Sequence, residues 1–300
     1  MTDAEIHDHD RGLQHDLPKL AASGFGRRRL LGLFGAAGAA AVLSACGDDG
    51  SSGSNGTSSS SSAGGPPAGG PNSGGAPPGG GMGGDSSVEV AEGEIPEETA
   101  GPYPGDGSNG VNVLSENGVV RSDIRSSFGA ASGVAAGVPI TVKLRVLDLN
   151  GDESAPLAGA AIYLWHCDRN GDYSMYSEAI KDENYLRGVQ ETDAQGRVEF
   201  TTVFPAAYSG RYPHMHFEVY PSLAEATSST KKLRTSQLAL PEDVCAEVYG
   251  NAEGYSASLD RLTQTPLDSD GIFADGYSLQ MAKVTGSITQ GYVATLNVPI

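Results

Sequence analysis

The chain has 300 residues, including 42 glycines and 17 prolines, and its formal net charge is −18 at pH 7. Because residues 1–46 hold five basic and five acidic side chains, the whole of that charge belongs to residues 47–300. Such an acidic excess argues against nucleic acid or an anionic lipid surface as a partner, and solubility outside the cell is its simplest explanation.

Residues 24–46 have the layout of an export signal. Arg27, Arg28 and Arg29 precede a short apolar stretch rich in glycine and alanine that ends at Cys46. A membrane-spanning helix needs roughly 20 strongly apolar residues, so this stretch predicts a signal and not an anchor helix. The arginine cluster resembles a twin-arginine signal, and "LSAC" resembles a bacterial lipobox.

Those two resemblances imply export, cleavage before Cys46 and a lipid on that cysteine. We therefore expect the protein at the outer face of a bacterial cell membrane, attached through Cys46 only, or in the periplasm or medium if the lipobox is not used. Residues 47–90, rich in Gly, Ser and Pro, predict a disordered tether because they have few apolar side chains to bury. A single folded domain is then expected over residues 91–300.

The pattern of that domain predicts an all-β fold. Short alternating or apolar runs, separated by turn residues, are typical of strands, and as many as seven of them suit a β-sandwich of two sheets. Hairpin-type turns are expected at 148–154 and 192–197. We expect a short helical turn within 241–250, and loops elsewhere, including 258–271. The predicted strands are 138–149, 158–167, 196–204, 214–220, 233–240, 277–286 and 291–300.

Two cysteines remain in this domain, Cys167 and Cys245. An oxidising compartment would permit them to pair, but the sequence cannot place two sulfurs within bonding distance. A disulfide and two buried thiols both stay open at this point.

The stretch "RYPHMHF" (211–217) holds two of the three histidines that would remain after signal cleavage. On a strand, residues i and i+2 point to the same face, so His214 and His216 could chelate one ion, although a solvated pair on a strand face is the alternative. Tyr173 and Tyr208 lie upstream. Two tyrosinates with two imidazoles make a hard, anionic donor set that favours Fe(III) over Fe(II) or zinc.

Four motifs in order resemble the intradiol ring-cleavage dioxygenases. They are W-x5-G-x-Y (165–173), T-D-x-x-G (192–196), P-x-x-Y (205–208) and R-x-P-H-x-H (211–216). The resemblance implies the β-sandwich of that family and Fe(III) bound by Tyr173, Tyr208, His214 and His216. The spacing from Tyr208 to His214 is shorter than in the best-known members, which leaves the substrate preference open.

The resemblance also implies further site residues and a reaction. Arg211 matches the family's active-site arginine, Gln237 matches a glutamine near the substrate, and "ETAGPYPGDG" (98–107), with Pro102 and Tyr103, matches a segment lining the substrate cleft. A catechol-type aromatic would be cleaved by O2 between its hydroxyl-bearing carbons, giving a cis,cis-muconate-type diacid, with Tyr208 as a base. The oligomeric state is left open.

Two other functions compete with this reading. A membrane-tethered sandwich that binds aromatics or sugars without turnover would share the fold. A zinc hydrolase using His214 and His216 would need a carboxylate that the sequence does not show beside them. Of the remaining candidates, we expect Trp165 and Tyr163 to be core residues, and His166 to lie at the surface or behind the ligands.

Overall fold

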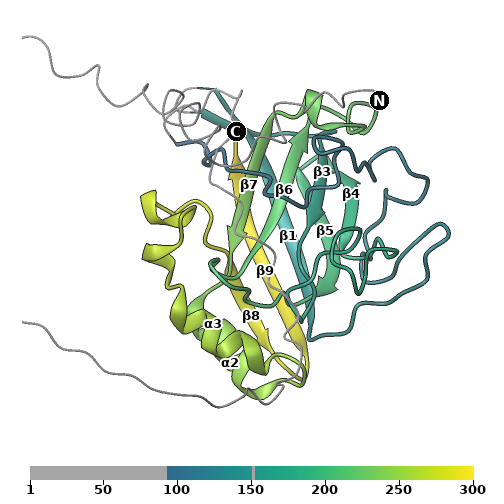
Figure 1. Ribbon diagram of the computed structural model, residues 1–300. Helices are drawn as coiled ribbons and strands as arrows, with labels where there is room; N and C mark the ends of the chain where they lie inside the picture. Colours follow the sequence, from purple (N-terminus) through teal and green to yellow (C-terminus); the bar gives the residue numbers. More distant parts are fainter. Residues whose placement is uncertain (1–92, 151–152) are drawn as a thin grey trace, which may run out of the picture. The chain divides into compact units, whose positions relative to one another are not determined.

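A computed structural model describes residues 93–150 and 153–300 (Figure 1). The predicted signal, Cys46 and the tether lie outside the described residues. Within the described ranges no helix has the length and apolar character needed to cross a membrane. The strands are β1 (Pro139–Asn150), β2 (Glu153–Pro156), β3 (Ala161–Trp165), β4 (Arg187–Glu191), β5 (Arg197–Val203), β6 (His214–Tyr220), β7 (Arg234–Ala239), β8 (Lys283–Ser287) and β9 (Gly291–Pro299).

The described strands form two sheets, which confirms the predicted β-sandwich. One sheet has the order β2-β1-β9-β8, with β5 also paired to β1, and the other has the order β4-β3-β6-β7. β1 and β9 run parallel, whereas the other pairs are antiparallel. The hairpin predicted at 148–154 is present, because Asn150 at the end of β1 pairs with Glu153 of β2.

Alternation along the strands builds the core between the sheets. Met215, Phe217 and Val219 of β6 point into this core, where they join Val142 and Leu144 of β1. The intervening residues of β6 point to the other face of their sheet, yet every residue of the strand is buried. Burial on both faces means that a second layer of chain covers the side on which the histidines lie.

The sequence reading was wrong about several elements. The turn at 192–197 is tight, since Gly196 N–H donates to the carbonyl of Asp193, but it joins β4 of one sheet to β5 of the other and closes no hairpin. β2 and β4 were not predicted: β2 is exposed throughout, and β4 contains a glycine and does not alternate. β8 is shorter than expected because residues 277–281 form turns.

The helical content also exceeds the prediction. α2 (Glu242–Asn251) is longer than one turn, and α3 (Ser256–Gln264) occupies part of a region predicted as loop. The two helices lie next to one another beside the strands (Figure 1). They dock through tyrosines: Tyr249 donates to the carbonyl of Pro205, and Tyr255 donates to that of Phe204. Short 3-10 turns are η2 (Ser229–Lys231), η3 (Leu267–Ser269) and η4 (Phe273–Asp275).

Cys167 and Cys245 are both free thiols, so no disulfide joins them. They belong to different apolar clusters, and each is within reach of a different backbone carbonyl, that of Ala206 for Cys167 and that of Leu240 for Cys245. Burial raises the pKa of both thiols, which disfavours the reactive thiolate.

We expect Cys167 and Cys245 to resist thiol reagents in the folded protein and to react after denaturation. Peptide mapping of labelled samples would measure this. Dithiothreitol should leave the melting temperature unchanged, and a drop on reduction would contradict the free-thiol arrangement.

Candidate metal centre

His214 and His216 lie side by side on the outward face of β6. Their Nε2 atoms are 3.1 Å apart and both rings are buried, so this pair is not on a solvated strand face. The neighbouring strands frame the second histidine, because His216 pairs with Trp165 of β3 and with Gln237 of β7. The two-residue period of a strand thus gives the chelating arrangement that the spacing predicts.

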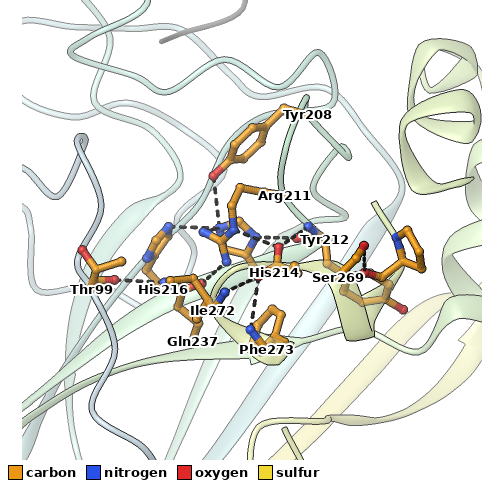
Figure 2. Close-up of polar contacts among 12 residues, drawn as sticks. Thr99, Tyr208, Arg211, Tyr212, His214, His216, Gln237, Ser269, Ile272 and Phe273 are labelled. Carbon is orange, nitrogen blue, oxygen red and sulfur yellow. Dashed lines mark hydrogen bonds and ion pairs between the residues drawn. The ribbon is translucent and has the colours of Figure 1, made fainter. Parts of the chain in front are cut away.

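Both predicted tyrosines reach the same point. Tyr208 Oη is 3.2 Å from His214 Nε2 and 3.4 Å from Tyr173 Oη (Figure 2 shows the contact with His214). Tyr208 comes from the loop between β5 and β6. Gly210 in this loop has φ +83°, which permits the turn in which the Arg211 N–H donates to the carbonyl of Tyr208. Tyr173 follows β3 and packs its buried ring against Tyr103, with ring centroids 5.0 Å apart.

Neighbouring groups fix the orientation of both imidazoles. His214 Nδ1–H donates to the carbonyl of Tyr212 at 2.5 Å, which leaves the Nε2 lone pair facing the tyrosines. Trp165 stacks on His216 with ring centroids 4.9 Å apart. Burial lowers the pKa of both histidines well below the ordinary value, and the charge of Arg211 lowers it further. The rings are therefore neutral, the form that binds metals.

The two phenols differ in their surroundings. Burial raises the pKa of Tyr208 to about 12, although Arg211 partly offsets this, whereas burial and the neighbouring Tyr208 hold the pKa of Tyr173 well above the usual value. Tyr173 is fully buried and Tyr208 is only partly so. Tyr208 is thus the less enclosed phenol of the two.

This donor set fits one metal ion. Two atoms bound tetrahedrally to one ion at about 2.0–2.1 Å lie about 3.3 Å apart. The consecutive donor separations here, from Tyr173 through Tyr208 and His214 to His216, are 3.4, 3.2 and 3.1 Å. With two phenol oxygens in the set, the site favours a hard, strongly Lewis-acidic cation.

Arg211 is anchored beside the donors and is not a surface arginine. Its Nε donates to Asp270 Oδ2 at 2.9 Å. Its Nη2 donates to Gln237 Oε1 at 2.6 Å (Figure 2). Its Nη1 lies 3.4 Å from His214 Nε2. Gln237 in turn donates to the carbonyl of Thr99. Two of the predicted residues, Arg211 and Gln237, are therefore joined directly at the centre.

The sequence reasoning missed Asp270. This fully buried carboxylate accepts from Arg211, from the Tyr212 N–H and from the N–H groups of Ile272 and Phe273, so it both starts η4 and holds the arginine. In the sequence, "DSDG" reads as an ordinary turn. The sequence could suggest only that a buried Arg211 needs a counterion. It could not indicate that Asp270 is the carboxylate that provides the charge.

The predicted cleft segment lies along this centre. Tyr103 contacts Tyr173, whereas Pro102 is exposed. Gly101 lies close to the ring of His216, because a Cβ built on that glycine would be 3.4 Å from the ring carbon Cε1. Residues 101–103 thus lie beside two of the donors, and Tyr103 rather than Pro102 makes the contact.

Three further sequence expectations can be compared with the structure. Tyr163 and Trp165 are fully buried core residues, as expected, although Trp165 also supports His216 by stacking. His166 is buried and not at the surface. Its ring nitrogens contact the carbonyl of Cys167 and the hydroxyl of Thr202, so it is not among the converging donors.

A hollow of about 860 Å³ lies on the other sheet, away from the predicted site. None of the predicted site residues lines it. Its polar lining includes Lys143, Arg145, Arg197 and Lys283. This hollow is therefore separate from the point where the donors converge.

Glu98, next to Thr99, should make stability depend on pH. Burial, and then the charge of Asp275, raises its pKa to about 7. The folded state thus favours the protonated acid. The contribution of Glu98 to the free energy of unfolding is fully present below pH 4.5 and is lost as pH rises through about 7. We expect Glu98→Gln to melt progressively higher than the wild type between pH 4.5 and 7. A constant difference across this range would contradict the assignment.

Comparisons with known proteins place this chain beside dioxygenases. Residues 120–234, which include both tyrosines, both histidines and Arg211, match the family model described as "Dioxygenase". A chlorocatechol 1,2-dioxygenase from Rhodococcus opacus is 30% identical over 92 residues, 27% of this chain and 35% of that protein. A catechol 1,2-dioxygenase 1 from Acinetobacter lwoffii is 30% identical over 122 residues, 40% of this chain and 34% of that protein.

The chain therefore matches about a third of the length of these two relatives. Among solved structures, an intradiol ring-cleavage dioxygenase from Tetranychus urticae aligns over 69% of this chain and 94% of that chain, with a TM-score of 0.53 and 22% identity. This last likeness is one of fold.

Proposed function

We propose that this chain, which belongs to the intradiol ring-cleavage dioxygenase family, opens the ring of a catechol-type aromatic with O2. Cleavage would fall between the two hydroxyl-bearing carbons and give a cis,cis-muconate-type diacid. One observation carries the proposal: two phenol oxygens and two neutral imidazole nitrogens converge, with neighbouring donors 3.1–3.4 Å apart.

The cofactor in this proposal is Fe(III), held by Tyr173, Tyr208, His214 and His216. When bound, this ion would supply the Lewis acidity that makes the phenolate forms accessible near neutral pH and activates an aromatic diol towards O2. The protein supplies two neutral imidazoles, two phenol oxygens and a buried setting.

The chain's own residues would divide the remaining work. Tyr208, in the phenolate form that a bound ion would favour, would take a proton from a substrate hydroxyl and become the neutral phenol. Arg211, fixed by Asp270 and Gln237, would hold positive charge where the ring accumulates negative charge. Trp165 keeps the His216 ring in place by stacking.

Arg211→Gln should lower kcat/KM by about 10²–10³-fold, because a fixed donor to developing charge is worth that much in a site sheltered from water. Steady-state kinetics at matched iron content would measure the effect. Arg145→Gln is the control, since Arg145 lies on the other sheet and donates to the carbonyl of Gln195. An Arg211→Gln enzyme as active as the control would contradict the role.

The deciding experiment is a visible absorption spectrum of the mature protein, with iron measured, before and after anaerobic addition of catechol. Tyrosinate-to-Fe(III) charge transfer should colour the protein, and catechol should shift the band to longer wavelength. A protein that stays colourless and iron-free after reconstitution would overturn the proposal and favour the membrane-tethered binding module for aromatics or sugars.

The zinc hydrolase is disfavoured by the arrangement of the carboxylate that reaches this centre. Asp270 is occupied by Arg211 and by three backbone N–H groups, so it is not free to bind zinc or to act as a general base.

We also propose that residues 1–46 direct export and that residues 47–90 tether the domain to the membrane through lipidated Cys46. Mass spectrometry of the mature N-terminus would test this. A lipid-modified Cys46 would support the tether, whereas an unprocessed N-terminus would overturn it.

A further inference from the structure

Arg187, the first residue of β4, donates a hydrogen bond from every N–H group of its guanidinium. The side chain is fully buried, and its guanidinium donates five hydrogen bonds, the full number that the group can make. Nη2 binds the carbonyls of Tyr103 and Ser174, Nη1 binds the carbonyl of Pro104 and the hydroxyl of Tyr163, and Nε binds the hydroxyl of Ser174, at 2.9–3.1 Å.

The partners of this cation are all neutral. The buried Arg234 pairs with Glu94, and Arg211 pairs with Asp270, but within the described ranges Arg187 has no carboxylate partner. A buried guanidinium without a counterion is costly unless dipoles surround it. No ion pair among the described residues explains why a buried arginine lies here. The position therefore depends on the planar guanidinium fork, which holds its N–H donors in a fixed arrangement.

The fork joins two stretches that are far apart in sequence. One is residues 101–105, which pass His216 at Gly101 and Tyr173 at Tyr103. The other is the turn at 173–176, which carries Tyr173. Gly105 leaves the space that the guanidinium needs, because a Cβ there would lie 3.0 Å from Arg187 Nη1.

Tyr176 reinforces the same junction. Its hydroxyl accepts from the Gly105 N–H and donates to Asn109 Oδ1, both at 2.9 Å, and its ring lies against the guanidinium of Arg187. Hydrogen bonds from two side chains therefore hold residues 101–109 over the phenol of Tyr173.

We propose that Arg187 is a positioning residue of this site: its guanidinium clamps residues 101–105 to the turn that carries Tyr173, and so sets where the substrate lies against the donors. The part of this statement that concerns substrate rests on the proposed function. The clamp itself is a property of the chain alone.

Hydrogen–deuterium exchange of the full chain without iron tests the clamp directly. Arg187→Lys keeps the charge but loses the fork, and we expect amides within 101–109 to exchange about tenfold faster than in the wild type. Amides of β1 and β5 should be unchanged. With iron and catechol present, kcat/KM should fall by about 10²-fold, mainly through KM, as expected for a misplaced cleft segment.

Arg145→Lys is the control. Arg145 is also an arginine that donates to a backbone carbonyl, that of Gln195, but it lies on the other sheet and contacts neither the segment nor the turn at 173–176. This variant should leave exchange at 101–109 and KM unchanged.

Two results would overturn the clamp. One is wild-type exchange and KM in Arg187→Lys, and the other is an Arg145→Lys variant that reproduces the effect. If Arg187→Lys does not fold, Tyr176→Phe removes the bond to Gly105 and should speed exchange at that amide; an unchanged rate would also overturn the proposal. Because exchange needs neither iron nor substrate, an inactive wild type would count against the proposed function alone.

Discussion

Replacing His216 with glutamine should weaken iron binding by at least about 100-fold, more than is usual when a residue behind a ligand is lost. The visible absorption of the reconstituted protein should disappear together with ring cleavage. The reason is geometric: His216 Nε2 lies 3.1 Å from His214 Nε2, and without it only three of the four converging donors remain. Metal analysis after dialysis, paired with the spectrum, would measure the loss.

His166→Gln is the control for this result. His166 is also buried, but its ring contacts Cys167 and Thr202 and not the donor group. Burial lowers its pKa to about 4, so it is neutral in the fold as the two site histidines are. We expect this variant to lose about 1–3 kcal/mol of stability, from buried polar groups left unpaired, and to keep its iron. Equal iron loss in both variants would show that the effect is general to buried histidines.

Tyr208→Phe should slow turnover by about 10²–10⁴-fold, the usual contribution of a positioned proton acceptor, while part of the iron stays bound. Tyr208 is the partly exposed phenol, and the charge of Arg211 partly offsets the rise of its pKa to about 12. Stopped-flow mixing with catechol should show slower substrate binding as well. Unchanged turnover would eliminate Tyr208 as the base.

Tyr173→Phe should behave differently from Tyr208→Phe. Its ring is fully buried and packed against Tyr103, so this phenol is fixed in place. We expect its loss to reduce iron affinity and to change the visible band of what iron remains. If the two variants gave the same phenotype, the separate roles of the two tyrosines would have to be abandoned.

The histidine pair could be predicted because it depends on local geometry. A strand repeats every two residues, so His214 and His216 had to share a face once β6 was identified. The convergence of Tyr173 and Tyr208 on that face could not be worked out from spacing, since it depends on how two loops fold over the sheet. Only the family resemblance indicated it.

The features that were missed depend on long-range packing. Asp270 reaches Arg211 from a position 59 residues away, and its neighbours resemble a surface turn. α3 is short and owes its place to contacts with α2 and with the loop that carries Tyr208, through Arg261 and the carbonyl of Ala207. Whether Cys167 and Cys245 pair depended on the distance between two clusters, which no local pattern encodes.

The parallel pairing of β1 with β9 has a consequence for how the molecule assembles. β9 lies between β1 and β8, so the first and the last strands of the described chain are neighbours inside one sheet. Closing so long a loop makes topologies of this kind slow to form. During synthesis, β1 can pair early with β2 and β5, but nearly the whole domain must leave the ribosome before it meets β9. Until then it exposes an unpaired edge, which is the period when the nascent chain is most vulnerable to aggregation.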